Sequence, residues 1–424
     1  MRTRIAGPIW AALVVVFSPV WVAVTQAADI KPFISEQVSP LEVITAKDSD
    51  GHVTHAVMRR PPGRPGPLPA AVFLHGGVEQ MPLDELRRRA AEPLEALFLA
   101  EGYVVVESTY RSRRDDPQRP ETVRSIVAMI DRVKKLPGVD PKSIVVVGSS
   151  GGGTLALELA AETDIAAIGP FEPATIIFMG MMNKTNRIGI GQDPQRYWTP
   201  EIQQKTRERL RRLRCPVFVG HGDINNLKKV NFEIFLPELM KAGKPVQIHV
   251  YPGMPHSVFS FYSPNRLEFI SRFFEDCNSM FKRYLVTQPV PVDRTAVQWV
   301  ADTPPKTPVG LRTVADLRDR PTVGVEDQPA PGETLVGTFR TGQLRLTVYL
   351  PIGSEQGQYE VQILRKAGEP IVTVSGSTTF DEYQNLVLGL QPDLTGSAPG
   401  RYMLGVRKAK SRWTYYPITL VQQQ

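Results

Sequence analysis

The chain has 424 residues, of which 42% are hydrophobic and 22% charged. This composition is ordinary for a globular protein, and the chain is too long for one average domain. The formal net charge is +7, but no zinc-finger, helix-turn-helix or stacking-aromatic pattern accompanies the basic residues, so nucleic acid is not an expected partner. A weak attraction to an anionic envelope is compatible with the charge.

The first 28 residues have the layout of a secretory signal peptide. Basic residues at Arg2 and Arg4 precede an apolar stretch from Ile9 to Val24, and two small residues, Ala27 and Ala28, follow it. Pro19 interrupts the apolar stretch, which favours a cleaved signal over an uncleaved membrane anchor. The sequence therefore predicts export, either to the periplasm or out of the cell.

From residue 29 to residue 286, short apolar runs alternate with helical patterns. The apolar runs predict strands at 41–45, 54–58, 70–74, 103–107, 144–147, 165–168, 216–219 and 246–251. The patterns around them predict helices at 83–101, 120–135, 152–162, 200–213, 229–242 and 265–284. Alternating strands and helices indicate an α/β domain with a doubly wound, mostly parallel sheet covered by helices on both faces.

The sequence changes character after residue 286. Residues 287–332 are rich in proline and poor in helical pattern, which indicates a linker. Residues 333–424 form short alternating runs separated by turn residues, which predicts an all-β accessory domain, an immunoglobulin-like sandwich. This region contains no histidine or cysteine, so we expect it to contact a polymer, the envelope or a partner protein, or to act as a spacer.

Residues 148–152, Gly-Ser-Ser-Gly-Gly, are the strongest chemical signal in the chain. They stand between the apolar run 144–147 and the helical stretch 153–160. A Gly-x-Ser-x-Gly sequence at a strand-to-helix turn is typical of a nucleophile elbow, which exposes the serine hydroxyl at the end of the sheet. The pattern predicts that Ser150 is a nucleophile; the alternative is an ordinary glycine-rich turn.

A nucleophilic serine needs a base to take its proton. Of the six histidines, His256 is the best candidate, because it follows the strand at 246–251 on a loop that leads to the last helix of the region. A structural loop histidine is the alternative.

These motifs together resemble the α/β-hydrolase superfamily, and most closely its prolyl oligopeptidase and dienelactone hydrolase branches. The resemblance rests on Leu-His-Gly-Gly at 74–77, the elbow, and Tyr-Pro-Gly-x-x-His-Ser-x-Phe at 251–259, and it covers about residues 65–285. It implies that Ser150 is the nucleophile, that His256 is the base, and that the backbone N–H groups of Gly77 and Gly151 form the oxyanion hole.

The acid of the expected triad departs from the family pattern. The family's aspartate usually stands three residues after the glycine of the preceding His-Gly pair, and that position is Asn225 here. Asp223 is the only carboxylate between Cys215 and Asn231. Either Asp223 reaches His256 through an altered loop, or the triad is weakened, because an asparagine does not stabilise an imidazolium.

Two further features leave alternatives open. Cys215 begins an apolar run and Cys277 lies near the end of the last helix, so an exported chain allows a disulfide between them or two buried thiols. Residues 171–182, Phe-Glu-Pro followed by a methionine-rich apolar run, lie where related hydrolases insert a lid; a packed core helix is the alternative.

The sequence therefore predicts an exported serine hydrolase that cleaves a small-molecule carboxylic ester or a short peptide or amide bond. Only about 40 residues separate the signal peptide from the strand before the oxyanion loop, too few for the propeller of large oligopeptidases. No metal or organic cofactor is implied, because no histidines stand at metal-binding spacing. The oligomeric state is not predicted, and the alternative function is a catalytically weak or inactive scaffold that acts as a binding protein.

Overall fold

The structure is a computed structural model. It describes residues 30–113, 116–182, 190, 193–224, 228–256, 266–301, 311–317, 337–351, 354–366, 369–380, 386–409 and 411–422. Within these residues, no helix combines the length and the apolar character needed to cross a bilayer.

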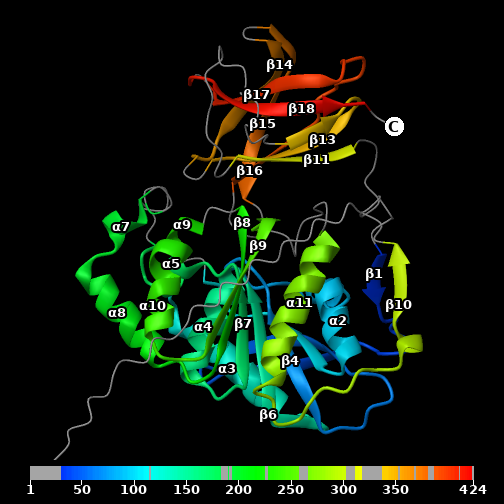
Figure 1. Cartoon of the computed structure of the whole chain (residues 1–424), viewed down its shortest axis with the longest axis vertical. Helices are drawn as coiled ribbons and strands as arrows, with labels where there is room; N and C mark the ends of the chain where they lie inside the picture. Colours follow the sequence, from blue (N-terminus) through cyan, green and yellow to red (C-terminus); the bar gives the residue numbers. More distant parts are fainter. Residues whose placement is uncertain are drawn as a thin grey trace, which may run out of the picture.

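The first large element is an eight-stranded sheet with the order β2-β3-β5-β4-β6-β7-β8-β9. Strands β4, β6, β7, β8 and β9 of this sheet are labelled in Figure 1. Strands β2 and β3 are antiparallel to their neighbours, whereas all pairs from β5 to β9 are parallel. This topology confirms the predicted doubly wound, mostly parallel sheet. The bounds are β2 Glu42–Lys47, β3 Val53–Arg59, β4 Leu68–Leu74, β5 Val104–Ser108, β6 Val139–Ser149, β7 Ala167–Phe171, β8 Val217–Ile224 and β9 Val246–Pro255.

Helices cover both faces of this sheet. Helices α3 (Pro120–Lys134), α4 (Gly151–Glu162), α8 (Pro200–Arg211) and α10 (Leu236–Lys241) contribute to one apolar core, and α2 (Pro93–Glu101) and α11 (Arg266–Lys282) contribute to the core on the other face. In Figure 1, α2 and α11 lie side by side. The remaining helices of this part are short: α1 Leu83–Arg89, α5 Thr175–Phe178, α7 Pro194–Tyr197 and α9 Lys228–Val230.

The helices form where the apolar spacing and the end residues favour them. In α3, Pro120 occupies the first turn and Lys134 the last, and the buried side chains Ile126, Ile130 and Val133 recur at helical spacing. The predicted helix at 83–101 is divided into α1 and α2, because Pro93 cannot continue a helix and instead begins the second one. The predicted helix at 229–242 is divided by a π-helix at Asn231–Phe235.

The two cysteines lie in different cores, which decides between the two alternatives in favour of two buried thiols and against the possible disulfide. Both are buried free thiols. Cys215 packs in the core that contains α3 and α4, whereas Cys277 packs in the core that contains α2 and α11. The sheet therefore separates the two sulfur atoms. Sequence position alone places a residue at the end of a strand or helix but does not assign it to a face of the sheet.

The predicted linker contains some secondary structure. Within it, the 3-10 turn η2 (Arg294–Ala296) leads to β10 (Gln298–Ala301), which pairs antiparallel with β1 (Ile30–Phe33). Farther along, β11 (Leu311–Asp316) pairs parallel with β13 (Leu344–Tyr349) in a second sheet.

The C-terminal region is β-rich as predicted. It contains a second eight-stranded sheet, with the order β11-β13-β16-β15-β14-β17-β18-β12. Its end strands β11 and β12 approach each other, so the sheet is nearly closed around its own apolar core. The immunoglobulin-like sandwich stays a prediction. The remaining bounds are β12 Gly337–Arg340, β14 Gln358–Lys366, β15 Glu369–Phe380, β16 Leu386–Leu390, β17 Gly400–Lys408 and β18 Thr414–Val421.

Candidate active site

Ser150 stands at a sharp turn between β6 and α4. Its φ and ψ are 52° and −112°, a conformation that side-chain-bearing residues rarely adopt. The turn is closed by a hydrogen bond from the Ser150 N–H to the Phe171 carbonyl, 3.0 Å. A Cβ on Gly148 would lie 2.2 Å from the Gly152 carbonyl oxygen, so the backbone crossing behind the serine leaves room only for glycine. This geometry is that of a nucleophile elbow.

His256 follows β9 and reaches the serine. Its Nε2 lies 3.1 Å from the Oγ of Ser150, and both residues are buried. The distance is within the range in which a base can take a proton from a hydroxyl.

The other ring nitrogen of His256 faces Glu172. Nδ1 lies 2.7 Å from Oε2 of this fully buried carboxylate. The two atoms are within ion-pair distance, although the contact does not have the geometry of a well-aligned hydrogen bond. Serine, imidazole and carboxylate therefore form one continuous chain of polar contacts.

The backbone around Glu172 directs its carboxylate inward. Glu172 directly follows β7 and has a φ of 43°, and its N–H donates to the Gly220 carbonyl at 2.8 Å. Its Oε1 accepts a 2.7 Å hydrogen bond from the N–H of Gly222 on β8. A Cβ on Gly222 would lie 2.7 Å from this Oε1 and 2.1 Å from the Met254 carbonyl oxygen. Glycine at 222 thus leaves room for both the carboxylate and the strand that leads to His256.

The surroundings keep Glu172 ionised. Burial alone raises the pKa of a carboxyl, but the contact with His256 and the charge of His256, with a smaller contribution from the Gly222 N–H, outweigh it and lower the pKa of Glu172 below its ordinary value. Glu172 is therefore a carboxylate at neutral pH, able to stabilise a positive charge on His256.

The loop after β4 lies against the elbow. Gly77 has a φ of 83°, and a Cβ on Gly151 would lie 2.1 Å from its carbonyl oxygen. The Tyr110 hydroxyl lies 2.9 Å from the Gly77 carbonyl and 3.1 Å from the His75 carbonyl and donates to this pair. The structure thus brings together the two glycines predicted to form the oxyanion hole.

Comparison with known proteins identifies the family of this region. Residues 103–285 match the model of the dienelactone hydrolase family. The chain contains a dienelactone hydrolase family domain. No curated protein matches the sequence of the chain.

Solved structures resemble the chain over about three fifths of its length. A thermostable esterase from Pseudomonas putida is 19% identical, with 60% of this chain and 86% of the esterase covered and a TM-score of 0.45. A puromycin-hydrolysing peptidase of Mycobacterium tuberculosis is 18% identical, with 60% of this chain and 41% of the peptidase covered and a TM-score of 0.46. At these identities and TM-scores the similarity carries no information about the activity or the substrate of this chain.

The structure brings together most, but not all, of the residues predicted for the site. Ser150 and His256 are in contact, and Gly77 and Gly151 are adjacent. The side chain of Asp223 and the whole of Asn225 lie outside the described residues.

Sequence analysis of the dienelactone hydrolase domain missed Glu172. The family pattern indicated the loop after β8, and residues 171–182 were interpreted as either a lid or a packed core helix, without a catalytic role for Glu172. One signal was available: Glu172 is a carboxylate placed directly after the first apolar strand that follows the elbow. That this strand lies beside β6 is known only from the structure. The methionine-rich run that follows it packs in the core, where Phe178, Met179 and Met181 are buried.

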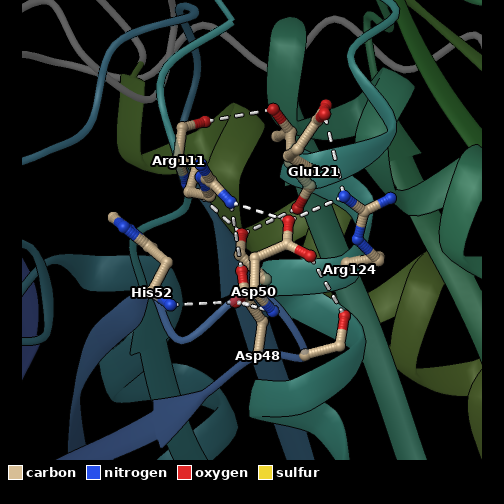
Figure 2. Close-up of polar contacts among 9 residues, drawn as sticks. Asp48, Asp50, His52, Arg111, Glu121 and Arg124 are labelled. Carbon is tan, nitrogen blue, oxygen red and sulfur yellow. Dashed lines mark hydrogen bonds and ion pairs between the residues drawn. The ribbon is translucent and has the colours of Figure 1, made fainter.

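A network of ion pairs holds the loop that follows β5 in the dienelactone hydrolase domain. Figure 2 shows Asp50, on the turn between β2 and β3, between two arginines. Its Oδ2 lies 3.2 Å from Arg111 and 2.7 Å from Arg124 on α3. Arg111 directly follows Tyr110, the residue that bonds the oxyanion loop. These pairs are partly exposed, so each contributes little to the free energy of folding.

Proposed function

We propose that this protein is an exported serine hydrolase that cleaves a carboxylic ester or a short peptide or amide bond through an acyl-enzyme on Ser150. The observation that carries the proposal is the continuous contact from Ser150 through His256 to the buried carboxylate of Glu172. This arrangement has the parts of a Ser-His-acid triad.

The first step follows from the geometry of the ring. A carboxylate only accepts hydrogen bonds, so the neutral imidazole of His256 carries its proton on Nδ1, toward Glu172, and presents the Nε2 lone pair to Ser150. As Oγ attacks the substrate carbonyl carbon, its proton passes to Nε2. Glu172 then stabilises the imidazolium, and the N–H groups of Gly77 and Gly151 donate to the oxyanion.

The second half of the reaction reverses the proton transfers. The imidazolium gives its proton from Nε2 to the leaving alcohol or amine, and the carbonyl of the acyl-enzyme re-forms. Water then enters, His256 removes its proton, and the acyl group leaves as a carboxylic acid with the proton returned to Oγ. No other co-reactant is required.

A fluorophosphonate probe tests the nucleophile directly. We expect one probe per chain by intact mass, and none in the Ser150→Ala variant. The neighbouring Ser149→Ala variant is the matched control and should react like the unaltered protein. Absence of reaction in the folded protein would contradict the serine mechanism and favour the alternative, an inactive scaffold that binds its ligand without cleaving it.

The inactive-scaffold alternative was motivated by the asparagine at position 225. Glu172 is a buried carboxylate in contact with His256, and this contact weakens the argument for an inactive scaffold. A panel of p-nitrophenyl esters and aminoacyl anilides separates esterase from peptidase activity, since an amide nitrogen leaves only after it is protonated.

Export is proposed from the layout of the first 28 residues. Expression with the native N-terminus, followed by cell fractionation and N-terminal sequencing, should give a product that begins at Asp29 and lies outside the cytoplasm. An intact N-terminus on a membrane-bound product would instead support an uncleaved anchor.

A further inference from the structure

A second buried histidine lies directly behind the carboxylate of Glu172. His221 stands on β8, is fully buried, and has its Nδ1 3.9 Å from Oε1 of Glu172. A positive charge on His221 would compete with the imidazolium of His256 for the same carboxylate. The protonation state of His221 therefore bears on the triad, although His221 touches neither Ser150 nor the reacting atoms in the mechanism proposed above.

Asn231 determines which nitrogen of His221 carries the proton. This fully buried residue begins the π-helix 231–235, a type of turn that is rare and often found at functional sites. Its Nδ2 lies 3.2 Å from the Pro173 carbonyl and 2.9 Å from Nε2 of His221, and its Oδ1 accepts from the hydroxyl of Thr175. Because a carbonyl only accepts, Nδ2 is the NH₂ group, and Nε2 of His221 must accept as well.

The proton of His221 is consequently on Nδ1. This atom lies 2.5 Å from the Gly222 carbonyl oxygen and donates to it. The same Gly222 donates its own N–H to Glu172. Asn231, His221 and Gly222 thus form a relay of hydrogen bonds that ends on the carboxylate.

Burial leaves His221 neutral. It is the largest influence and lowers the pKa of the imidazolium; the charge of Glu172 and the hydrogen bond to the Gly222 carbonyl oppose this, and positive charge on His256 or Lys228 adds to it. Phe232 packs edge-on against the ring at 4.9 Å between centroids. Because His221 is neutral and Phe232 is apolar, neither competes with His256 for the negative charge of Glu172.

We propose that Asn231 is a positioning residue for the triad. It holds His221 in the neutral Nδ1–H form and connects β8 to the Pro173 loop by hydrogen bonds, so that the negative charge of Glu172 stabilises His256 and not His221. This inference rests on the proposed function for its catalytic consequence. The hydrogen-bonding state of His221 can be measured without any catalysis, so the two proposals fail separately.

The first test is spectroscopic. Long-range ¹H–¹⁵N correlation spectra of histidine-labelled protein at pH 7, with the signal of His221 assigned by its loss in a His221→Gln variant, should show the neutral Nδ1–H form. In the Asn231→Asp variant the new carboxylate accepts a proton from Nε2, and we expect an imidazolium. An Nε2–H form in the unaltered protein, or a neutral His221 in Asn231→Asp, would overturn the proposal.

The second test is kinetic and uses p-nitrophenyl acetate. We expect Asn231→Asp to lower kcat by about 100-fold with little change in KM, the scale of loss that a small misplacement of catalytic groups produces. The loss should diminish as pH rises and His221 loses its added proton. Thr175→Val, which removes the donor to Asn231, should give a smaller loss of the same kind and serves if Asn231→Asp does not fold.

Asn278→Asp is the matched control, because Asn278 is another buried amide, on α11, whose Oδ1 accepts from the Tyr103 hydroxyl. It should leave kcat within about twofold. An equal loss in the two folded aspartate variants, or no loss in Asn231→Asp, would contradict a role for Asn231 in the triad.

Discussion

Ser150 and Glu172 are register neighbours at the ends of two adjacent parallel strands, and both have a positive φ, 52° and 43°. They are the non-glycine residues with this conformation in the described part of the chain. Each costs of order 1 kcal/mol or more of backbone strain, which the surrounding structure must offset. Both side chains contact His256, so the ends of β6 and β7 together present the proposed nucleophile and the proposed acid.

The first prediction identifies the acid by comparing two matched substitutions. Glu172→Gln keeps the shape of the side chain but removes the charge that stabilises imidazolium, so we expect kcat to fall by about 10⁴-fold, the loss seen for an acid-to-amide change in a well-studied triad. Asp223→Asn should change kcat by less than about tenfold. Steady-state hydrolysis of p-nitrophenyl acetate measures both, and the reverse ranking would assign the role to Asp223.

The second prediction concerns the space beside the acid. A methyl group at position 222 would overlap the Met254 carbonyl and the Glu172 carboxylate, so Gly222→Ala should lower the free energy of unfolding by about 1–3 kcal/mol and slow reaction with the fluorophosphonate. Gly389→Ala is the control, because no atom lies within 4 Å of its added Cβ. Urea unfolding of the three proteins checks this, and equal stability of Gly222→Ala and the unaltered protein would contradict it.

The third prediction is a pH dependence of stability from His75. Burial lowers the pKa of His75 to about 3, although its hydrogen bond to the Gly76 carbonyl opposes this. In the unfolded chain, His75 has its ordinary pKa of about 6.5 and is protonated below that pH. In the native state, it does not take up the proton until about pH 3. The stabilisation is therefore present above pH 6.5 and is lost as pH falls, by up to about 1.4 kcal/mol per pH unit.

A His75→Gln variant isolates this contribution. The difference in the free energy of unfolding between the unaltered protein and the variant should shrink as pH falls from 7 to 5, as measured by urea unfolding at each pH. A difference that stays constant over this range would show that His75 takes up its proton in the native state as readily as in the unfolded chain.

The fourth prediction concerns the two thiols. Burial raises the pKa of Cys215 to about 12 and raises that of Cys277 as well, so neither thiol should react with a disulfide reagent in the native protein. Unfolding without a reductant should release two reactive thiols per chain. Thiols that appear only after reduction would instead show that the cysteines are bridged.

Much of the site was predictable because its signals are local. The elbow needs only glycine around Ser150 and a strand and a helix on either side, and all of these lie within a few residues of one another. His256 could be predicted because it follows a parallel strand, and the carboxyl ends of parallel strands lie at the same edge of the sheet as the elbow. In each case a short stretch of sequence specifies the local backbone and the direction of the side chain.

The amino-acid sequence by itself determined the parallel α/β sheet, the β-rich second region, the nucleophile elbow and the histidine, since periodicity and turn chemistry act over short distances. Only the tertiary structure decided which carboxylate meets His256 and which face of the sheet each cysteine occupies. Both depend on the order and register of strands far apart in the chain, where side-chain packing rather than local preference selects the neighbour. Glu172 is close to His256 because β7 lies beside β6 and β8 leaves it room at Gly222.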